Sequence, residues 1–76
     1  MNKEQMLAIV KVKEDCINRI IKIVNVQLKL VDLAKRNIIS YEEFVEHYEG
    51  LEECKETLKE LKKTCSNRID KYLEAV

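Results

Sequence analysis

Apolar residues recur at helical spacing along most of the chain and divide it into two long amphipathic segments. In the first, residues 3–37, apolar positions follow one another three or four residues apart with no turn residue between them. The run IIKIVNV alternates as a strand would, but a periodic segment of about 30 residues is far longer than a strand. In the second, residues 41–74, one apolar stripe of ordinary width continues past Gly50. We predict two long helices, with a kink or break near Gly50 as the open alternative.

The first predicted helix is apolar around more than half of its circumference. At about 100° per residue, its polar residues between positions 16 and 34 form one narrow stripe, and the apolar arc covers roughly 200°. A surface helix that packs on one neighbour needs an apolar arc of only about 100°. The rest of a 76-residue chain supplies one neighbour, so we expect a second copy of the chain to supply another. The residues expected at this dimer contact are Ile17, Ile20, Ile21, Val24, Gln27, Leu28, Val31 and Ala34.

The start of the second helix is the best-specified local feature. Ser40-Tyr41-Glu42-Glu43 is a capping box, in which the Ser40 hydroxyl and the Glu43 carboxylate each accept a backbone N–H of the other residue. Ile39 and Phe44 have the spacing of a hydrophobic staple. These residues predict that a helix begins at about residue 41.

The connection between the helices is short. Asn37 suits a left-handed residue at the end of the first helix, which leaves a turn of residues 38–40. So short a turn makes the helices antiparallel and brings Gln27 level with Leu51. Gln27 would there either set the register or reach a solvent gap. We predict an all-α fold with a single helical-hairpin domain over residues 1–76, which dimerises into a four-helix bundle.

Residues 30–51, LVDLAKRNIISYEEFVEHYEGL, carry a local resemblance. The segment resembles the turn of short helical-hairpin oligomerisation modules called SHOCT domains, where a Leu-rich helix leads into an Ile-Ile, polar-polar, Glu-Glu-Phe turn. It covers less than a third of the chain, and Asn37 stands where those modules usually carry glycine. The resemblance implies a hairpin that oligomerises.

Composition and charge support a small globular helical protein. The chain is 46% hydrophobic and 37% charged, with no Pro and one Gly, which argues against disorder. Its net charge is zero, so no overall field favours nucleic acid or membrane. Residues 1–39 hold eight Lys/Arg against four Asp/Glu, and residues 40–76 hold six against ten. Antiparallel halves of opposite sign would attract each other.

Two charged surfaces are candidates for binding a partner. The second helix begins with an acidic stretch that contains no basic residue up to position 53, and it either binds a partner protein or only complements the helix dipole. Its members considered for partner binding are Glu42, Glu43, Glu46, Glu49 and Glu53. Lys22, Lys29 and Arg36 recur every seven residues and could follow phosphates. No nucleic-acid-binding motif accompanies that row. A nucleic-acid-binding regulator is therefore the alternative function, and protein binding is the first.

Candidate chemistry is sparse. His47 is the one histidine, and we expect it to be a structural, hydrogen-bonded residue without further metal ligands around it. Cys16, Cys54 and Cys65 all fall on predicted apolar faces, where reduced cysteine behaves as a small hydrophobic residue. Whether Cys16 and Cys65 can pair stays open. We therefore expect no metal, no cofactor and no enzymatic activity.

The chain is expected to act in the cytoplasm. Its N-terminal apolar residues are interrupted by charges, unlike a signal peptide, and residues 20–34 hold too many polar groups to span a membrane. Three cysteines, an odd number, fit a reducing compartment. Abundant Lys, Ile, Asn and Glu are typical of AT-rich genomes, which favours a bacterial or phage origin. The function predicted is a small regulatory or adaptor protein that self-associates and binds a partner protein.

Overall fold

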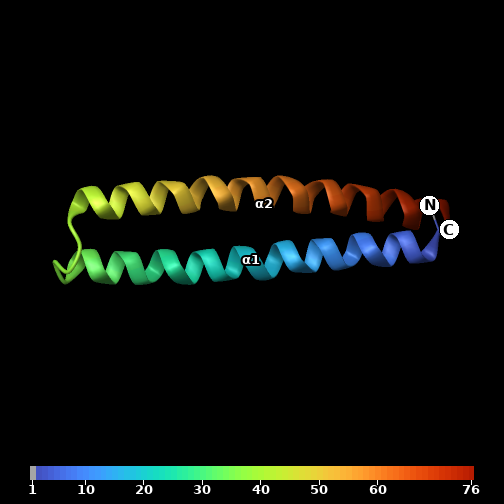
Figure 1. Ribbon diagram of the computed structural model, residues 1–76. Coiled ribbons are helices and arrows are strands. Elements are labelled where there is room, and N and C mark those ends of the chain that lie inside the picture. The colour runs from blue at the N-terminus through green and yellow to red at the C-terminus, as the bar shows by residue number, and fades with distance from the viewer. Residues whose placement is uncertain (1) are drawn as a thin grey trace.

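The chain folds into two antiparallel helices (Figure 1). The structure, a computed structural model, describes residues 2–76. Helix α1 spans Lys3–Lys35 and helix α2 spans Tyr41–Ala75, so the two chain ends lie at the same end of the hairpin. The molecule measures 55 × 14 × 14 Å. The predicted all-α hairpin is confirmed, and α2 continues through Gly50 as one helix.

Both helices begin with a capping box. The Ser40 hydroxyl accepts a hydrogen bond from the Glu43 amide at 3.1 Å, and the Glu43 carboxylate accepts one from the Ser40 amide at 3.4 Å. Asn2 and Gln5 form the same reciprocal pair at the start of α1, at 2.8 and 3.1 Å. The Ser40 box was predicted, and the Asn2 box is an additional one. Each box satisfies amides that the first turn of a helix leaves without an intrahelical partner.

Helix α1 ends at Lys35, two residues before the predicted end. Asn37 has φ 59°, the left-handed conformation expected of it. The Asn37 amide donates to the Ala34 carbonyl at 3.1 Å, and the Ile38 amide donates to the Leu33 carbonyl at 3.0 Å. These two bonds form a Schellman motif, which satisfies the last carbonyls of the helix and turns the chain toward α2.

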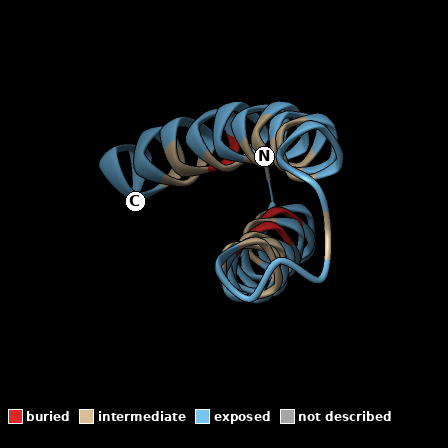
Figure 2. Cartoon of the chain, turned by 90° about the vertical axis from the view of Figure 1, so that its left-hand side faces the viewer, coloured by how far each residue is buried: buried red, intermediate tan, exposed pale blue. Residues whose placement is uncertain are grey.

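The residues between the helices repeat at alternating spacings of three and four. On both helices these inner positions are buried or half-buried, and they face each other in the end-on view (Figure 2). This is the spacing of the a and d positions of a coiled coil. The inner positions are Met6, Ile9, Lys13, Cys16, Ile20, Ile23, Gln27, Leu30 and Ala34 on α1, and Tyr48, Leu51, Lys55, Leu58, Lys62, Cys65, Ile69 and Tyr72 on α2.

The interior of the hairpin is thin. Only Ile9, Cys16 and Cys65 among the apolar residues of the described chain are buried, and none of its large side chains is completely enclosed. Two helices form a single line of contact, and most inner side chains therefore stay only half-buried. The hairpin alone leaves a large part of its apolar surface in water.

The inner face of α2 is more polar than the sequence pattern indicates. Cys54 and Leu61, which belong to the predicted apolar stripe, are exposed, and Lys55 and Lys62 occupy inner positions in their place. Lysine suits such positions because its aliphatic stem covers apolar surface while its ammonium group reaches a polar neighbour or water. At Gly50, a Cβ atom would meet nothing within 4 Å, so α1 does not approach α2 closely at this glycine.

Candidate functional site

One face of α1 carries apolar side chains that α2 does not cover. Ile17, Ile21, Val24 and Leu28 are 37%, 53%, 37% and 63% exposed, and Val31 is half-buried. These five residues, here called the outer face, are also spaced four and three residues apart. At about 100° per residue they lie roughly a quarter turn around the helix from the inner positions. Helix α1 therefore has two neighbouring apolar seams, and the hairpin covers one of them.

The eight residues predicted for the dimer contact divide between these seams. The five of the outer face are available to another molecule. Ile20 and Ala34 occupy half-buried inner positions, and Gln27 is 4% exposed and bonded to α2. The division arises because one arc of roughly 200° contains two adjacent three-and-four repeats. The candidate site therefore contains five of the eight residues predicted for the dimer contact.

A shallow groove lies beside the outer face. Val24, Leu28 and Val31 line it from α1, and Tyr48 and Lys55 line it from α2, with Gln27 as the remaining lining residue. The Tyr48 ring lies 5.2 Å from the Phe44 ring, measured between centroids, and the two are tilted by 39°. This aromatic pair extends the apolar surface of α1 onto the start of α2.

A polar cluster joins the two helices next to this groove. The Gln27 amide nitrogen donates to the Glu52 carboxylate at 2.8 Å, one residue beyond Leu51, with which the sequence places Gln27 level. The Lys55 ammonium donates to the same Glu52 oxygen at 2.6 Å and to the Gln27 amide oxygen at 3.3 Å. Gln27 is thus buried, and its amide nitrogen and oxygen both have partners on α2. Its side chain therefore does not reach a solvent gap, which was the alternative expectation.

The cluster shifts the titration of both charged members. The hydrogen bond from Lys55, followed by that from Gln27, lowers the pKa of Glu52 below its ordinary value of 4.5. The hydrogen bond to Glu52 raises the pKa of Lys55 above its ordinary value of 10.5. Both shifts favour the charged forms, so the pair stays ionised over a wider pH range than either group would alone.

The predicted acidic surface lies near the turn. Its five members, Glu42, Glu43, Glu46, Glu49 and Glu53, are all exposed. Glu43 also closes the capping box of α2, so four carboxylates have no part in a hydrogen bond or ion pair among residues 2–76. These four carboxylates face solvent close to the first turns of α2, and binding of a partner by them stays a prediction.

The basic row of α1 is exposed as well. Lys22, Lys29 and Arg36 all lie on the solvent side, and Arg36 is 3.6 Å from the Asp32 carboxylate in an ion pair. Lys22 and Lys29 belong to no ion pair in the described part of the chain. A nucleic-acid-binding role of this row stays a prediction.

The histidine and one cysteine lie elsewhere than expected. His47 is exposed and takes part in no side-chain hydrogen bond among the described residues, so the expected structural role is wrong. Cys16 and Cys65 are buried as predicted, but Cys54 is exposed, and all three thiols are free. The residues His47 and Cys54 border the inner face, where a small change in helix rotation decides between burial and exposure.

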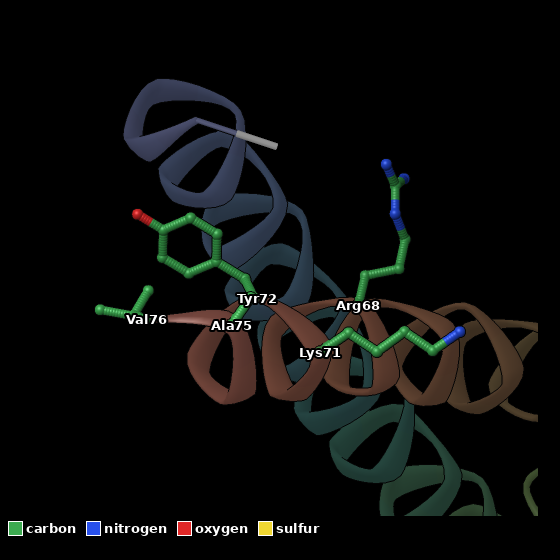
Figure 3. A pocket seen from close by; sticks show the side chains of 5 residues that line it. All are labelled: Arg68, Lys71, Tyr72, Ala75 and Val76. Carbon is green, nitrogen blue, oxygen red and sulfur yellow. The ribbon is translucent and has the colours of Figure 1, made fainter.

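A hollow at the open end of the hairpin does not gather reactive groups. Arg68, Lys71, Tyr72, Ala75 and Val76 line it, and the side chains of Arg68 and Lys71 extend away from the Tyr72 ring (Figure 3). Within residues 2–76, no cluster of three or more His, Cys, Asp or Glu side chains could hold a metal ion. No helix in this part of the chain is both long and apolar enough to cross a bilayer.

Comparisons of the chain with known protein families, with curated proteins and with solved structures find no match. No family match accompanies the local resemblance of residues 30–51 to the turn of SHOCT domains.

Proposed function

We propose that this chain is a protein–protein interaction module that self-associates through the outer face of α1 into a four-helix bundle and binds a partner protein through the acidic start of α2. The proposal describes a regulatory or adaptor protein and involves no catalytic step. The exposed Cys54 thiol is free, which fits a reducing compartment such as the cytoplasm.

The single observation that carries self-association is the exposure of the outer face. Leu28 and Ile21 leave more than half of their surface in water, at 63% and 53%. A fully buried side chain of this size contributes about 1.5–3 kcal/mol relative to an exposed one. Large contiguous apolar patches are rare on soluble monomers and commonly mark sites of interaction.

The total surface of the hairpin supports the same conclusion. Its accessible area is 5975 Å². A compact monomer of 9.0 kDa would expose about 4,900 Å². The excess of roughly 1,100 Å² is similar to the approximately 800 Å² that each partner buries in a stable interface. Pairing of two hairpins would therefore bring the exposed area of each into the ordinary range.

A second copy is the partner that best fits this face. Two-fold pairing requires a patch that complements itself, and five aliphatic residues with no central charge meet that requirement. The three-and-four spacing of the outer face matches helix-on-helix packing, in which side chains of one helix fill the holes of another. The acidic carboxylates lie on α2, so they would remain free for a different protein.

Sedimentation of a Val24→Asp variant tests the proposal. Val24 is the middle residue of the outer face, and a carboxylate buried there would oppose association. We expect the variant to sediment as a monomer and to retain its helical circular dichroism, because Val24 is outside the inner seam. Asn25→Asp is the matched control, since it adds the same charge one residue away on the exposed polar stripe. If Val24→Asp remains as associated as Asn25→Asp, the proposed face is wrong.

Binding through the acidic surface has its own test. A doubly substituted Glu46→Gln/Glu49→Gln chain keeps side-chain size and removes two exposed charges. Proteins from the native host that bind the unaltered chain through this surface should be lost with the double variant and retained by Val24→Asp. Equal capture by the unaltered chain and the double variant would contradict the acidic surface as the binding site.

A further inference from the structure

Charged residues bound the outer face at both ends. Glu14 precedes Ile21 by seven residues and Lys35 follows Leu28 by seven, so the four residues form one column along α1. Glu14 and Lys35 are exposed, and neither belongs to an ion pair within the described hairpin. The five residues of the outer face are thus flanked by one unpaired negative and one unpaired positive charge.

The spacing of these charges is nearly symmetric about the middle of the face. Glu14 lies 10 residues before Val24, and Lys35 lies 11 residues after it. At 1.5 Å per residue, the two charges are about 15 and 16 Å from Val24 along the helix axis. A two-fold axis near Val24 would therefore bring Glu14 of one copy within about one turn of Lys35 of the other, and would do so twice.

The apolar residues follow the same symmetry. Ile17 and Val31 are each seven residues from Val24, so an antiparallel pair of helices would place Ile17 near Val31 of the second copy. Ile21 and Leu28 would meet in the same way, three and four residues from the axis. Antiparallel pairing about Val24 therefore covers the whole outer face and leaves no member unopposed.

Parallel pairing would place like charges together. Glu14 would lie beside Glu14 of the second copy, and Lys35 beside Lys35. Like charges on facing helices destabilise an interface, while opposite charges at flanking positions select partner and orientation. The charge pattern therefore favours the antiparallel arrangement, although both arrangements bury the same aliphatic residues.

We propose that two copies of this chain pair their α1 helices antiparallel about Val24, with Glu14 of each copy beside Lys35 of the other. This inference rests on the proposed self-association and adds its orientation and register. The charges at the two ends of the face select the orientation, and the aliphatic residues between them supply the affinity.

Cross-linking through introduced cysteines distinguishes the two arrangements. The background carries Cys16→Ala, Cys54→Ser and Cys65→Ala, with folding checked by circular dichroism, and the probe is a short bifunctional maleimide. Val24→Cys should cross-link to itself. Ile17→Cys should not, because antiparallel pairing separates the two copies of residue 17 by about 21 Å. A mixture of Ile17→Cys and Val31→Cys chains should give a cross-linked heterodimer.

Each other result overturns a specific claim. Cross-linking of Ile17→Cys to itself, with none in the mixture, would exclude the antiparallel orientation while self-association through the outer face stands. No cross-linking of Val24→Cys in chains that sediment as dimers would reject the face and with it the orientation. Chains that sediment as monomers would reject the self-association on which this inference rests.

Charge exchange provides an independent measure of the same pairing. Glu14→Lys or Lys35→Glu alone should raise the dimer dissociation constant about tenfold, since each replaces two attractive contacts by two repulsive ones. The double exchange Glu14→Lys/Lys35→Glu should restore affinity. Asn18→Lys, on the exposed polar stripe, is the control for added charge. A double variant that is as weak as the single ones would contradict the Glu14–Lys35 contact.

Discussion

Individual side chains decide how the two helices meet. Gln27 is the least exposed polar residue, and its amide is held by Glu52 and Lys55 from the opposite helix. An apolar residue at the same position would pack in several registers, whereas an amide satisfied at both ends fits one. We infer that this cluster fixes the register of the hairpin and thereby the position of the outer face relative to α2.

The lowered pKa of Glu52 predicts a loss of stability in acid. A carboxyl whose pKa is lower in the folded chain contributes stability above its unfolded value, here 4.5, and loses it as the pH falls through the folded value. Urea unfolding at a fixed chain concentration should therefore show a larger fall in midpoint between pH 7 and pH 3 for the unaltered chain than for Glu52→Gln.

Glu53→Gln is the control for this measurement, because Glu53 is an exposed neighbour whose carboxylate forms none of the hydrogen bonds found within residues 2–76. Equal acid sensitivity of Glu52→Gln and the unaltered chain would show that Glu52 does not cause the loss of stability in acid.

Lys55 acts at alkaline pH. Its raised pKa contributes stability that is present below pH 10.5 and is lost as the pH rises through the folded value.

At the scale of the helices, the local signals agree with where the helices begin and end, and Gly50 is the one residue that disfavours the helix around it. Capping boxes begin both helices, and a left-handed asparagine ends the first. Gly50 lies in the interior of α2 with no close neighbour and no special backbone conformation. Its only local effect is to lower helix propensity at that position.

Gly50→Ala should therefore stabilise the chain by about 1 kcal/mol, the difference in propensity between glycine and alanine inside a helix. Chemical denaturation measures this change directly, and the dimer dissociation constant should stay the same because Gly50 is outside the outer face. A destabilised variant would show that a second copy or a partner approaches α2 closely at this position.

Much of the fold could be predicted from the sequence because the signals for helices are local. The spacing of apolar residues and the Ser40 capping box are sufficient for two helices, a tight turn and an antiparallel hairpin. The Asn2 box uses glutamine in place of glutamate and begins at the second residue. The apolar pattern has not yet started there, so it does not indicate this box.

The allocation of side chains between the two seams could not be predicted from the same pattern. Cys54 and Lys55 are adjacent, with Lys55 at an inner position and Cys54 at the border of the inner face, and hydropathy alone favours cysteine inside. At the inner position, the Lys55 ammonium donates to Glu52 on its own helix and to Gln27 on α1, and Gln27 is 25 to 28 residues away from the two charged residues in the sequence. A helical wheel of one segment contains no information about such a partner.

The whole molecule is long and thin, as expected of one subunit of a larger helical bundle. Its longest dimension is 55 Å and its other dimensions are 14 Å, so most residues lie on the surface. A hairpin of this shape has one line of inner contacts, while α1 carries a second seam of the same spacing with nothing packed on it. Small helical chains commonly gain the missing core by oligomerisation. Association through the outer face would supply it.

Sedimentation equilibrium of the unaltered chain over a wide concentration range tests self-association most directly. We predict a mass that approaches twice the 9.0 kDa of one chain as the concentration rises, with the monomer recovered only on dilution. A constant mass of 9.0 kDa at the highest concentration, with the chain still helical, would contradict the proposed role of the outer face.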